Sequence, residues 1–358
     1  MDARNWNMYL LTSLTNIKNY TKKRWRVKMK RRFTLLLAVL LITSIVTAGC
    51  GGNTPAPTTA APTTAAPTEA PTEAPKVFKV GINNFGQANF FARIGKATLE
   101  EQIVANGGEV IATVTADVPS RMTAIENMVS QGVDAIIIQE GDISQVAPAL
   151  IEAKAKGILI ASMDAGDADF VDVFCESDND QLGEMAARKM IEFMGEKGNV
   201  VEIFNDAGSM IRVRKEAMHR VVEEFPDVEI VAGFTYAWPD FFPDGKAKME
   251  AILQANPNPG DIGGVYATFD GVGLAAAQAI REAGLTDSIV VVGIDGDPEA
   301  YIEMAKPDSP FKATMAQDPE TMARTVVDQL FELLKGNTIP ERHIYIPGVL
   351  ITKDNIPQ

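Results

Sequence analysis

The sequence is poor in the residues that build metal centres and disulfide frameworks. Its 358 residues include only two cysteines and two histidines. They are Cys50, Cys175, His219 and His343. No cluster with the ligand spacing of a zinc site can be assembled from them, and two cysteines cannot form a disulfide framework. We therefore expect no zinc-type metal site, and we predict no cofactor.

Basic residues are also scarce beyond the first 49 residues. That segment holds ten Lys or Arg and a single acid, Asp2, whereas the remainder holds 23 basic and 46 acidic residues and has a formal charge of −23. So acidic a chain repels nucleic acid and anionic lipid headgroups, and basic patches with interleaved aromatics are absent from it. We exclude nucleic acid as a partner.

Residues 29–49 have the three parts of an export signal. Met29 precedes three basic residues, an uncharged and mostly apolar run over residues 33–46, and a short segment of small residues. The run is shorter than the roughly 20 residues of a membrane-spanning helix, so we interpret it as a cleaved signal peptide. Residues 1–28 fit neither a signal nor a domain. We interpret them as an untranslated or upstream extension.

Cys50 follows Ala48 and Gly49, and this context resembles the lipobox of bacterial lipoproteins, although Thr47 stands where Leu is usual. We predict that Cys50 accepts a diacylglycerol and anchors an exported protein on the outer face of the cytoplasmic membrane. The alternative is a buried cysteine near an ordinary cleavage site. Residues 50–75, rich in Thr, Ala and Pro, cannot build a core and are predicted to be a semi-stiff tether.

From Lys76 onward, short β-branched runs alternate with longer segments of helical period. Strands are predicted over residues 77–82, 109–114, 135–138, 158–161, 199–204, 228–231, 264–267 and 289–293. Helices are predicted over residues 89–106 and 318–335, the latter with Asp318 as its cap and Gly336 as its stop. Continuous apolar strands alternating with helices predict an α/β protein with doubly wound parallel sheets. The length allows two lobes and a cleft.

Polar residues follow several of these strands at the point where each one ends. They are Asn83, Asn84, Gln139, Glu140, Asp164, Asp270 and Asp295. Any single Asp among them could merely cap the next helix. Parallel sheets bind ligands beyond the carboxyl ends of their strands, so polar groups at five equivalent places favour a binding site.

Several short segments together resemble the periplasmic sugar-binding proteins of the ribose-binding type. They are Phe90 with Phe91, residues 132–138, residues 177–179 with Gly183, Arg214 within residues 211–216, residues 291–296 and residues 313–317. The resemblance spans about residues 76–353. It implies the periplasmic binding protein-like type I fold, in which three hinge strands join two lobes. The implied N-terminal lobe comprises residues 76–177 and 317–345, and the C-terminal lobe residues 178–316 and 346–358.

The resemblance also implies ligand contacts from both lobes. They are Asn84, Phe90, Phe91, Gln139, Asp164, Arg214, Trp238, Phe269, Asp295 and Gln317. Such a set suits a sugar, because aromatic rings cover its apolar faces while polar and charged groups pair with its hydroxyls. An insertion near Trp238 leaves Phe241 as the alternative wall residue. Ala88, Ala165 and Phe269 each replace a hydrogen-bonding residue of the pattern, which leaves open a particular sugar, an inositol or another small ligand.

The resemblance implies a monomeric binding protein, not an enzyme, that delivers a sugar or polyol to the permease and ATPase subunits of an ABC importer. Lactose-repressor-like regulators share the fold, but an export signal, and no helix-turn-helix, precedes this domain. A sensor that presents its ligand to a membrane receptor is one alternative. A dinucleotide-binding enzyme is another, because residues 271–276 match G-x-G-x-x-A. Against it, Asp270 would place a carboxylate beside the pyrophosphate.

Overall fold

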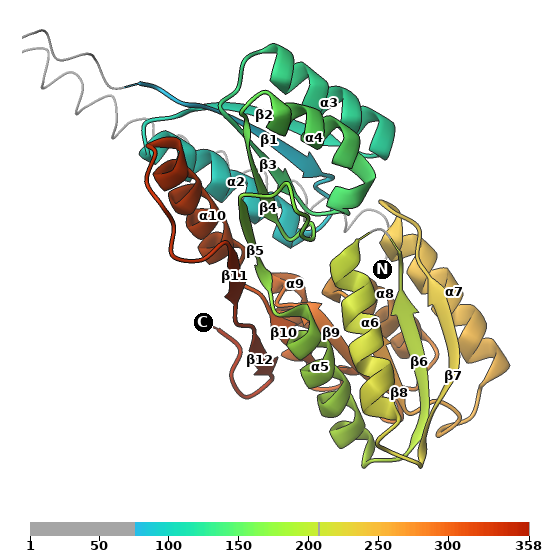
Figure 1. Ribbon diagram of the computed structural model, residues 1–358. Helices are drawn as coiled ribbons and strands as arrows, with labels where there is room; N and C mark the ends of the chain where they lie inside the picture. The colour runs from blue at the N-terminus through green and yellow to red at the C-terminus, as the bar shows by residue number, and fades with distance from the viewer. Residues whose placement is uncertain (1–75, 207, 358) are drawn as a thin grey trace, which may run out of the picture. The chain divides into compact units, whose positions relative to one another are not determined.

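The computed structural model describes residues 76–206 and 208–357, all of which belong to one unit of the chain, Glu73–Gln358. The predicted signal peptide, Cys50 and the tether lie outside the described residues. Two six-stranded sheets form the two lobes (Figure 1). The first sheet has the order β11-β5-β4-β3-β1-β2 and the second the order β12-β10-β9-β8-β6-β7.

The strands of the N-terminal lobe are β1 (Lys79–Phe85), β2 (Glu109–Thr115), β3 (Ala135–Gln139), β4 (Leu159–Met163), β5 (Val173–Ser177) and β11 (His343–Ile346). Those of the C-terminal lobe are β6 (Gly198–Phe204), β7 (Val228–Thr235), β8 (Gly264–Ala267), β9 (Val290–Asp295), β10 (Phe311–Ala316) and β12 (Val349–Thr352). Neighbouring strands pair in parallel, apart from β12, which is antiparallel to β10. The prediction of two lobes built on parallel α/β sheets is confirmed.

Helices cover both faces of each sheet, as the continuous apolar strands require. In the N-terminal lobe they are α2 (Phe90–Ala105) and α10 (Pro319–Leu334) on one face, and α3 (Val118–Ser130), η1 (Ile143–Val146) and α4 (Ala147–Ala155) on the other. In the C-terminal lobe they are α5 (Asn179–Met194) and α6 (Ser209–Val222) on one face, and α7 (Phe241–Ala255), α8 (Asp270–Glu282) and α9 (Pro298–Met304) on the other. Across the described ranges, no helix is both long enough and apolar enough to span a membrane.

Local sequence explains where the helices begin and end. Asp318 caps α10, since its Oδ1 atom accepts a hydrogen bond of 2.9 Å from the Thr321 amide. Gly336 follows the helix with φ of +82°, a left-handed conformation that glycine adopts without strain. Asn89 caps α2 in the same manner, accepting a 2.7 Å bond from the Ala92 amide. The predicted ends of both helices agree with these caps.

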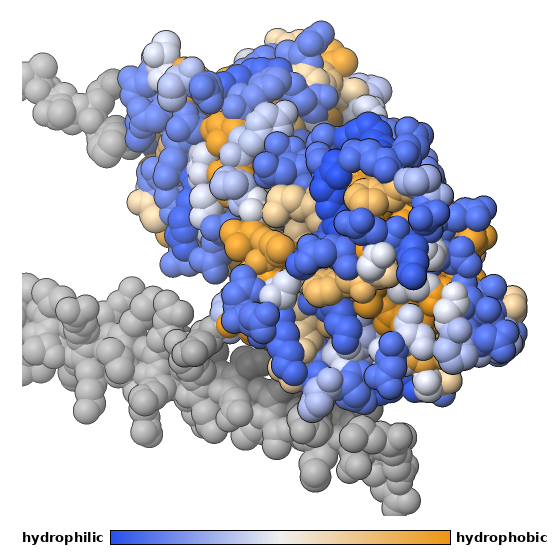
Figure 2. Space-filling view, turned by 90° about the horizontal axis from the view of Figure 1, so that it is seen from below, coloured by the Kyte–Doolittle hydropathy of each residue, from blue (hydrophilic) through white to orange (hydrophobic). Residues whose placement is uncertain are grey.

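The chain passes between the two sheets three times. The crossings run from β5 to α5, from β10 to α10, and from β11 to β12. The boundary expected after residue 345 falls within β11, whose last residue is Ile346. The face of the protein seen in Figure 2 is largely hydrophilic, with hydrophobic residues in limited areas.

Candidate functional site

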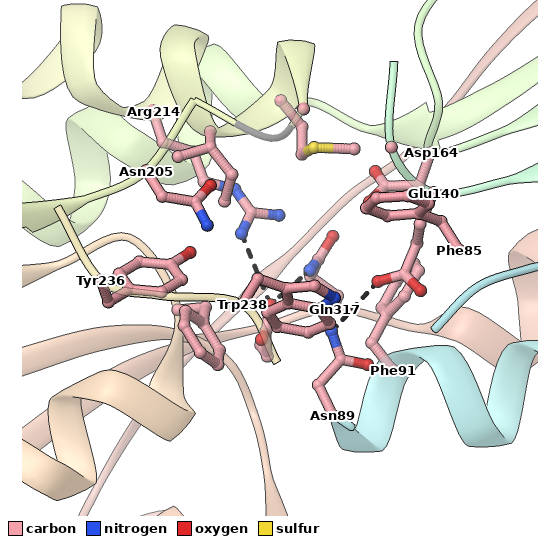
Figure 3. Close-up of a pocket in the computed structure, with 16 residues that line it drawn as sticks. Phe85, Asn89, Phe91, Glu140, Asp164, Asn205, Arg214, Tyr236, Trp238 and Gln317 are labelled. Atoms are coloured by element: carbon pink, nitrogen blue, oxygen red, sulfur yellow. Dashed lines mark hydrogen bonds and ion pairs between the residues drawn. The ribbon is translucent and has the colours of Figure 1, made fainter. Parts of the chain in front are cut away.

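A pocket lies where the carboxyl ends of strands from both sheets meet (Figure 3). The parallel register pairs Gln139 of β3 with Met163 of β4. The next residues along the chain, Glu140 and Asp164, therefore emerge at neighbouring strand ends, and both line the pocket. The second lobe contributes Asp295, the last residue of β9. The pocket thus occupies the position at which parallel sheets bind ligands.

The structure brings seven of the ten predicted site residues into the lining of this pocket. They are Phe91, Asp164, Arg214, Trp238, Phe269, Asp295 and Gln317. Figure 3 shows Arg214 on one side of the pocket and Asp164 and Phe91 on the other, with Trp238 and Gln317 between them in this view. Side chains from both lobes therefore converge on one space.

The other three predicted residues do not line the pocket. Asn84 and Gln139 are fully buried behind it, where the Asn84 amide donates a 2.7 Å hydrogen bond to Gln139 Oε1. Both amides also donate to the Ala92 carbonyl, at 3.2 Å each, and so fix the first turn of α2 against the sheet. Phe90 is half-buried outside the lining, because successive helical residues point about 100° apart and Phe91 takes the inward direction.

Several lining residues were not among the predicted ligand contacts. They are Phe85, Asn89, Glu140, Asn205, Met210, Ile211 and Tyr236. Glu140 was identified as a polar residue at the end of β3, but Gln139 was taken as the contact there. Asn205 follows β6 and Tyr236 follows β7, so the rule that located Asp164 would have found both if it had been applied to every strand end.

Aromatic side chains form one wall of the pocket. Trp238 stacks on Phe241 with ring centroids 5.5 Å apart and an interplanar angle of 23°. Phe241 meets Phe269 edge-on at 4.9 Å, and Tyr236 packs against Phe269 at 5.1 Å. Trp238 lines the pocket whereas Phe241 lies behind it, so Trp238 is the residue available to a ligand face. Such a wall suits an apolar ring face.

Arg214 is buried and held by three acceptors. Its Nε donates to Asn179 Oδ1 at 2.8 Å, and its Nη1 donates to the Thr268 carbonyl at 2.9 Å. Asp295 Oδ1 lies 3.5 Å from the same Nη1. Its Nη2 has no hydrogen-bonding partner among residues 76–206 and 208–357. This fixed guanidinium can therefore direct one terminal nitrogen at a bound ligand.

The three carboxylate residues of the pocket have unusual backbone conformations. Glu140, Asp164 and Asp295 have φ values of 56°, 53° and 137°. Glu196 is the remaining non-glycine residue with positive φ in the described ranges. Positive φ costs free energy in residues that carry a Cβ, and such strain concentrates at binding and catalytic sites. This coincidence marks the pocket as the functional site independently of its shape.

Burial disfavours the charged forms of these carboxylates. It raises the pKa of Glu140 to about 8, while the Asn89 side chain opposes the shift by hydrogen bonding. Burial also raises the pKa of Asp164, and the charge of Arg214 opposes that shift. Asp295, nearest to Arg214, has its pKa raised to only about 6. Outside the pocket, burial raises the pKa of Glu176 to about 8.

These pKa values predict that the unliganded protein loses stability as pH rises. The folded protein keeps protons on buried carboxyls at pH values where the unfolded chain has released them. Their stabilising contribution is therefore complete near the unfolded values of about 4 and is lost as pH rises through about 8. We expect the Tm to be lower at pH 8.5 than at pH 5.5 by on the order of 5 °C or more.

Thermal unfolding of two variants checks the origin of this slope. Glu176→Gln removes one half-buried titrating group outside the pocket and should reduce the difference in Tm between the two pH values. Glu152→Gln alters an exposed carboxylate paired with Lys156 and should leave the difference unchanged. A wild-type Tm that rises between pH 5.5 and 8.5 contradicts the assignment.

The G-x-G-x-x-A segment has a packing role. A Cβ at Gly271 would lie 2.5 Å from the Phe269 ring, and one at Gly273 would lie 2.8 Å from the Phe311 ring. The preceding Asp270 is fully buried, and its Oδ2 accepts bonds from the amides of Gly296 and Asp297, at 2.9 Å each. Gly271 and Gly273 leave space for the neighbouring phenyl rings. The Asp270 carboxylate hydrogen-bonds α8 to the turn after β9.

Two α/β lobes with a pocket at their facing strand ends define the class of two-domain solute-binding proteins. The chain matches the periplasmic binding protein domain over residues 80–338 and belongs to that family. It is 30% identical to the D-apiose import binding protein of Actinobacillus succinogenes over 250 residues, covering 69% of this chain and 78% of the relative. It is 29% identical to the ribose import binding protein of Bacillus subtilis, covering 74% of this chain and 84% of the relative.

A solved structure gives the same assignment. The solute-binding protein of an ABC transporter from Agrobacterium vitis, crystallised with bound allitol, superposes with a TM-score of 0.74 at 29% identity. The match covers 78% of this chain and 97% of that protein. The predicted type I fold is confirmed, and so is the prediction of a solute-binding protein of the sugar-importing class, since these relatives are binding proteins of transporters and not enzymes.

Proposed function

We propose that the chain captures one small sugar or polyol between its lobes and delivers it to the permease of an ABC importer. The single observation that carries the proposal is the combination of an aromatic wall with buried acceptor oxygens. Within the described residues, Glu140 Oε2, Asp164 Oδ1 and Gln317 Oε1 are buried and have no hydrogen-bond partner. Burying such atoms unpaired is unfavourable, so a ligand rich in donors is needed to satisfy them. Hydroxyl groups arranged around a ring or chain supply these donors.

A thermal-shift screen of monosaccharides and polyols tests this function. A ligand present at 100 times its Kd stabilises the folded protein by about 2.7 kcal/mol and raises the Tm accordingly. We expect one or a few related compounds to do so, while disaccharides and amino acids do not. A protein that responds to amino acids and to no sugar or polyol is not the binding protein proposed here.

We also propose that the mature protein is a monomer held at the outer face of the cytoplasmic membrane by a lipid on Cys50. Hydrophilic residues predominate on the face seen in Figure 2, and this favours a monomer as far as that face is concerned, because stable subunit interfaces are more apolar. The anchor is supported by the small residues before Cys50 and by the Thr/Ala/Pro segment that follows it. The anchor would keep the folded lobes near the permease.

Cys50→Ser should release the protein from the membrane fraction, because the serine hydroxyl does not take the thioether-linked lipid. Fractionation of cells, followed by detection of the chain in the soluble extracytoplasmic fraction, measures the effect. Cys175→Ser is the matched control, since Cys175 is a buried residue of β5, and we expect it to remain membrane-bound. Retention of a cleaved Cys50→Ser protein on the membrane would place the anchor elsewhere.

A further inference from the structure

The acidic and basic groups that line the pocket are unequal in number. Three carboxyl groups, those of Glu140, Asp164 and Asp295, face a single guanidinium, that of Arg214. Arg214 pairs with Asp295. Within the described ranges, Glu140 and Asp164 have no salt-bridge partner. Their acidic side of the pocket is visible in Figure 3, opposite Arg214.

A second arginine lies close by, but it does not line the pocket. Arg121 is 1% exposed, and its Nε donates to Asn83 Oδ1 at 2.7 Å while its Nη2 donates to the Glu140 carbonyl at 2.6 Å. Its guanidinium also lies over the Phe85 ring, 5.0 Å from the centroid. The donors of Arg121 thus serve an amide and the backbone, and the carboxylate of Glu140 receives none of them.

The unpaired oxygens on this side of the pocket are acceptors once the carboxyl groups have ionised. Glu140 Oε1 accepts one hydrogen bond, from the Asn89 amide at 3.1 Å, while its Oε2 is buried and unpaired within the described residues. Asp164 is only 3% exposed, and its Oδ1 is likewise buried and unpaired there. A hydroxyl brings one donor together with acceptor lone pairs, whereas an ammonium group brings three donors and a positive charge. We call the side of the pocket formed by Glu140 and Asp164 the acidic corner. An ammonium group there supplies donors to both unpaired oxygens and a positive charge opposite the two carboxylates.

We propose that the natural ligand is a sugar or polyol that carries a protonated amino group, and that this group binds between Glu140 and Asp164. The inference rests on the proposed function and narrows its ligand class. The hydroxyl groups of the same ligand reach Arg214 Nη2 and Gln317 on the other side. The aromatic rings of Phe85 and Phe91 near the acidic corner add favourable contact with a cation.

The electrostatic surroundings of Glu140 agree with this placement. The charged groups that shift its pKa are Asp164 and Asp295, which raise it, and Arg121, which lowers it. Arg214 is paired with Asp295, and its charge also lowers the pKa of Asp164, but it is not among the groups that lower the pKa of Glu140. In the unliganded protein burial keeps Glu140 protonated at neutral pH, and a bound ammonium supplies the countercharge that allows it to ionise.

Calorimetric titration of the purified full chain with matched ligand pairs tests the inference. Each pair differs by one amine in place of one hydroxyl: ribitol and 1-amino-1-deoxyribitol, myo-inositol and its monoamino analogue, and D-allose and 3-amino-3-deoxy-D-allose. We expect the amino member of at least one pair to bind ten times more tightly or better. Glu140→Gln keeps the shape and the bond from Asn89 but removes the charge, and should reduce this preference to less than about threefold.

Two further variants test whether the preference for the amine depends on Glu140 and Asp164. Asp164→Asn should also weaken the preference, and it serves as the test if Glu140→Gln does not fold. Glu176→Gln removes a half-buried carboxylate that does not line the pocket, and it should keep the preference of the wild type.

Neutral members that bind as tightly as their amino partners overturn the inference and leave the proposed function standing. The same conclusion follows if the amine is preferred but Glu140→Gln and Asp164→Asn leave that preference unchanged. A protein that binds neither member of any pair, nor any other sugar or polyol, overturns the proposed function and the inference with it.

Discussion

Arg214→Ala is expected to weaken ligand binding by about tenfold to a few hundredfold and to destabilise the protein by about 3 kcal/mol. The loss of affinity follows from the charge-assisted hydrogen bond that Nη2 can give to a ligand, because such bonds contribute roughly 1.5–3 kcal/mol. The loss of stability follows from the partners that remain. Asp295 is buried and would lose its arginine, and removing one partner of a buried pair leaves an uncompensated charge.

Titration calorimetry and thermal unfolding of two companion variants separate these effects. Arg214→Lys keeps a positive charge near Asp295 but lacks the planar fork, so it should recover part of the stability and little of the affinity. Arg220→Ala is the matched control on the same helix, because Arg220 is exposed and pairs only with the exposed Asp180 among the described residues. It should change stability by less than about 1 kcal/mol and leave affinity unchanged. Wild-type affinity in Arg214→Ala would remove Arg214 from the site.

Gly183→Val is expected to lower the Tm by on the order of 5 °C or more and to weaken binding, although Gly183 does not line the pocket. Gly183 lies on α5 where that helix packs against α6. A Cβ there would lie 2.7 Å from the Arg214 carbonyl oxygen and 2.8 Å from its Cα. These are backbone atoms that cannot rotate away, so α6 must shift and carry the guanidinium of Arg214 with it.

Gly263, in the same lobe, serves as a control, because a side chain there would not displace α6. A Cβ at Gly263 would meet the flexible end of Met194 at 3.1 Å and backbone atoms only at 3.7 Å or more. Gly263→Ala should therefore be mild in both thermal unfolding and titration. If Gly183→Val binds ligand as tightly as the wild type does, the position of Arg214 does not depend on the contact between α5 and α6.

The sequence was sufficient to predict the lobes and their main elements because local signals and burial patterns agree there. The strands of both sheet centres are continuous apolar runs, and α10 has a cap at Asp318, a stop at Gly336 and a regular apolar stripe between them. The antiparallel pairing of β12 with β10 was not predicted. Strand direction at that edge is set by the last crossing of the chain between the lobes, which leaves no periodic signal.

The site was predictable to the level of strand ends but not to the level of single side chains. Neighbouring residues at a strand end point in different directions, and sequence alone does not say which one faces the ligand. We predicted Gln139 as the contact at the end of β3, but the residue that lines the pocket is Glu140. The positive φ of Glu140 turns the chain at that point. Phe90 and Phe91 present the same ambiguity on a helix. Asn205 and Tyr236 were missed because the strand-end rule was not applied to β6 and β7, although it located Asp295 at the end of β9 in the same lobe.

The most direct test of the account is calorimetric titration of the purified full chain with the sugar or polyol that most raises its Tm. We predict one site per chain, and we predict that Trp238→Ala and Arg214→Lys each weaken binding at least tenfold, because these side chains line the pocket as its aromatic wall and its guanidinium. Binding that neither variant affects, or a stoichiometry other than one, would contradict the assignment of the pocket between the lobes as the ligand site.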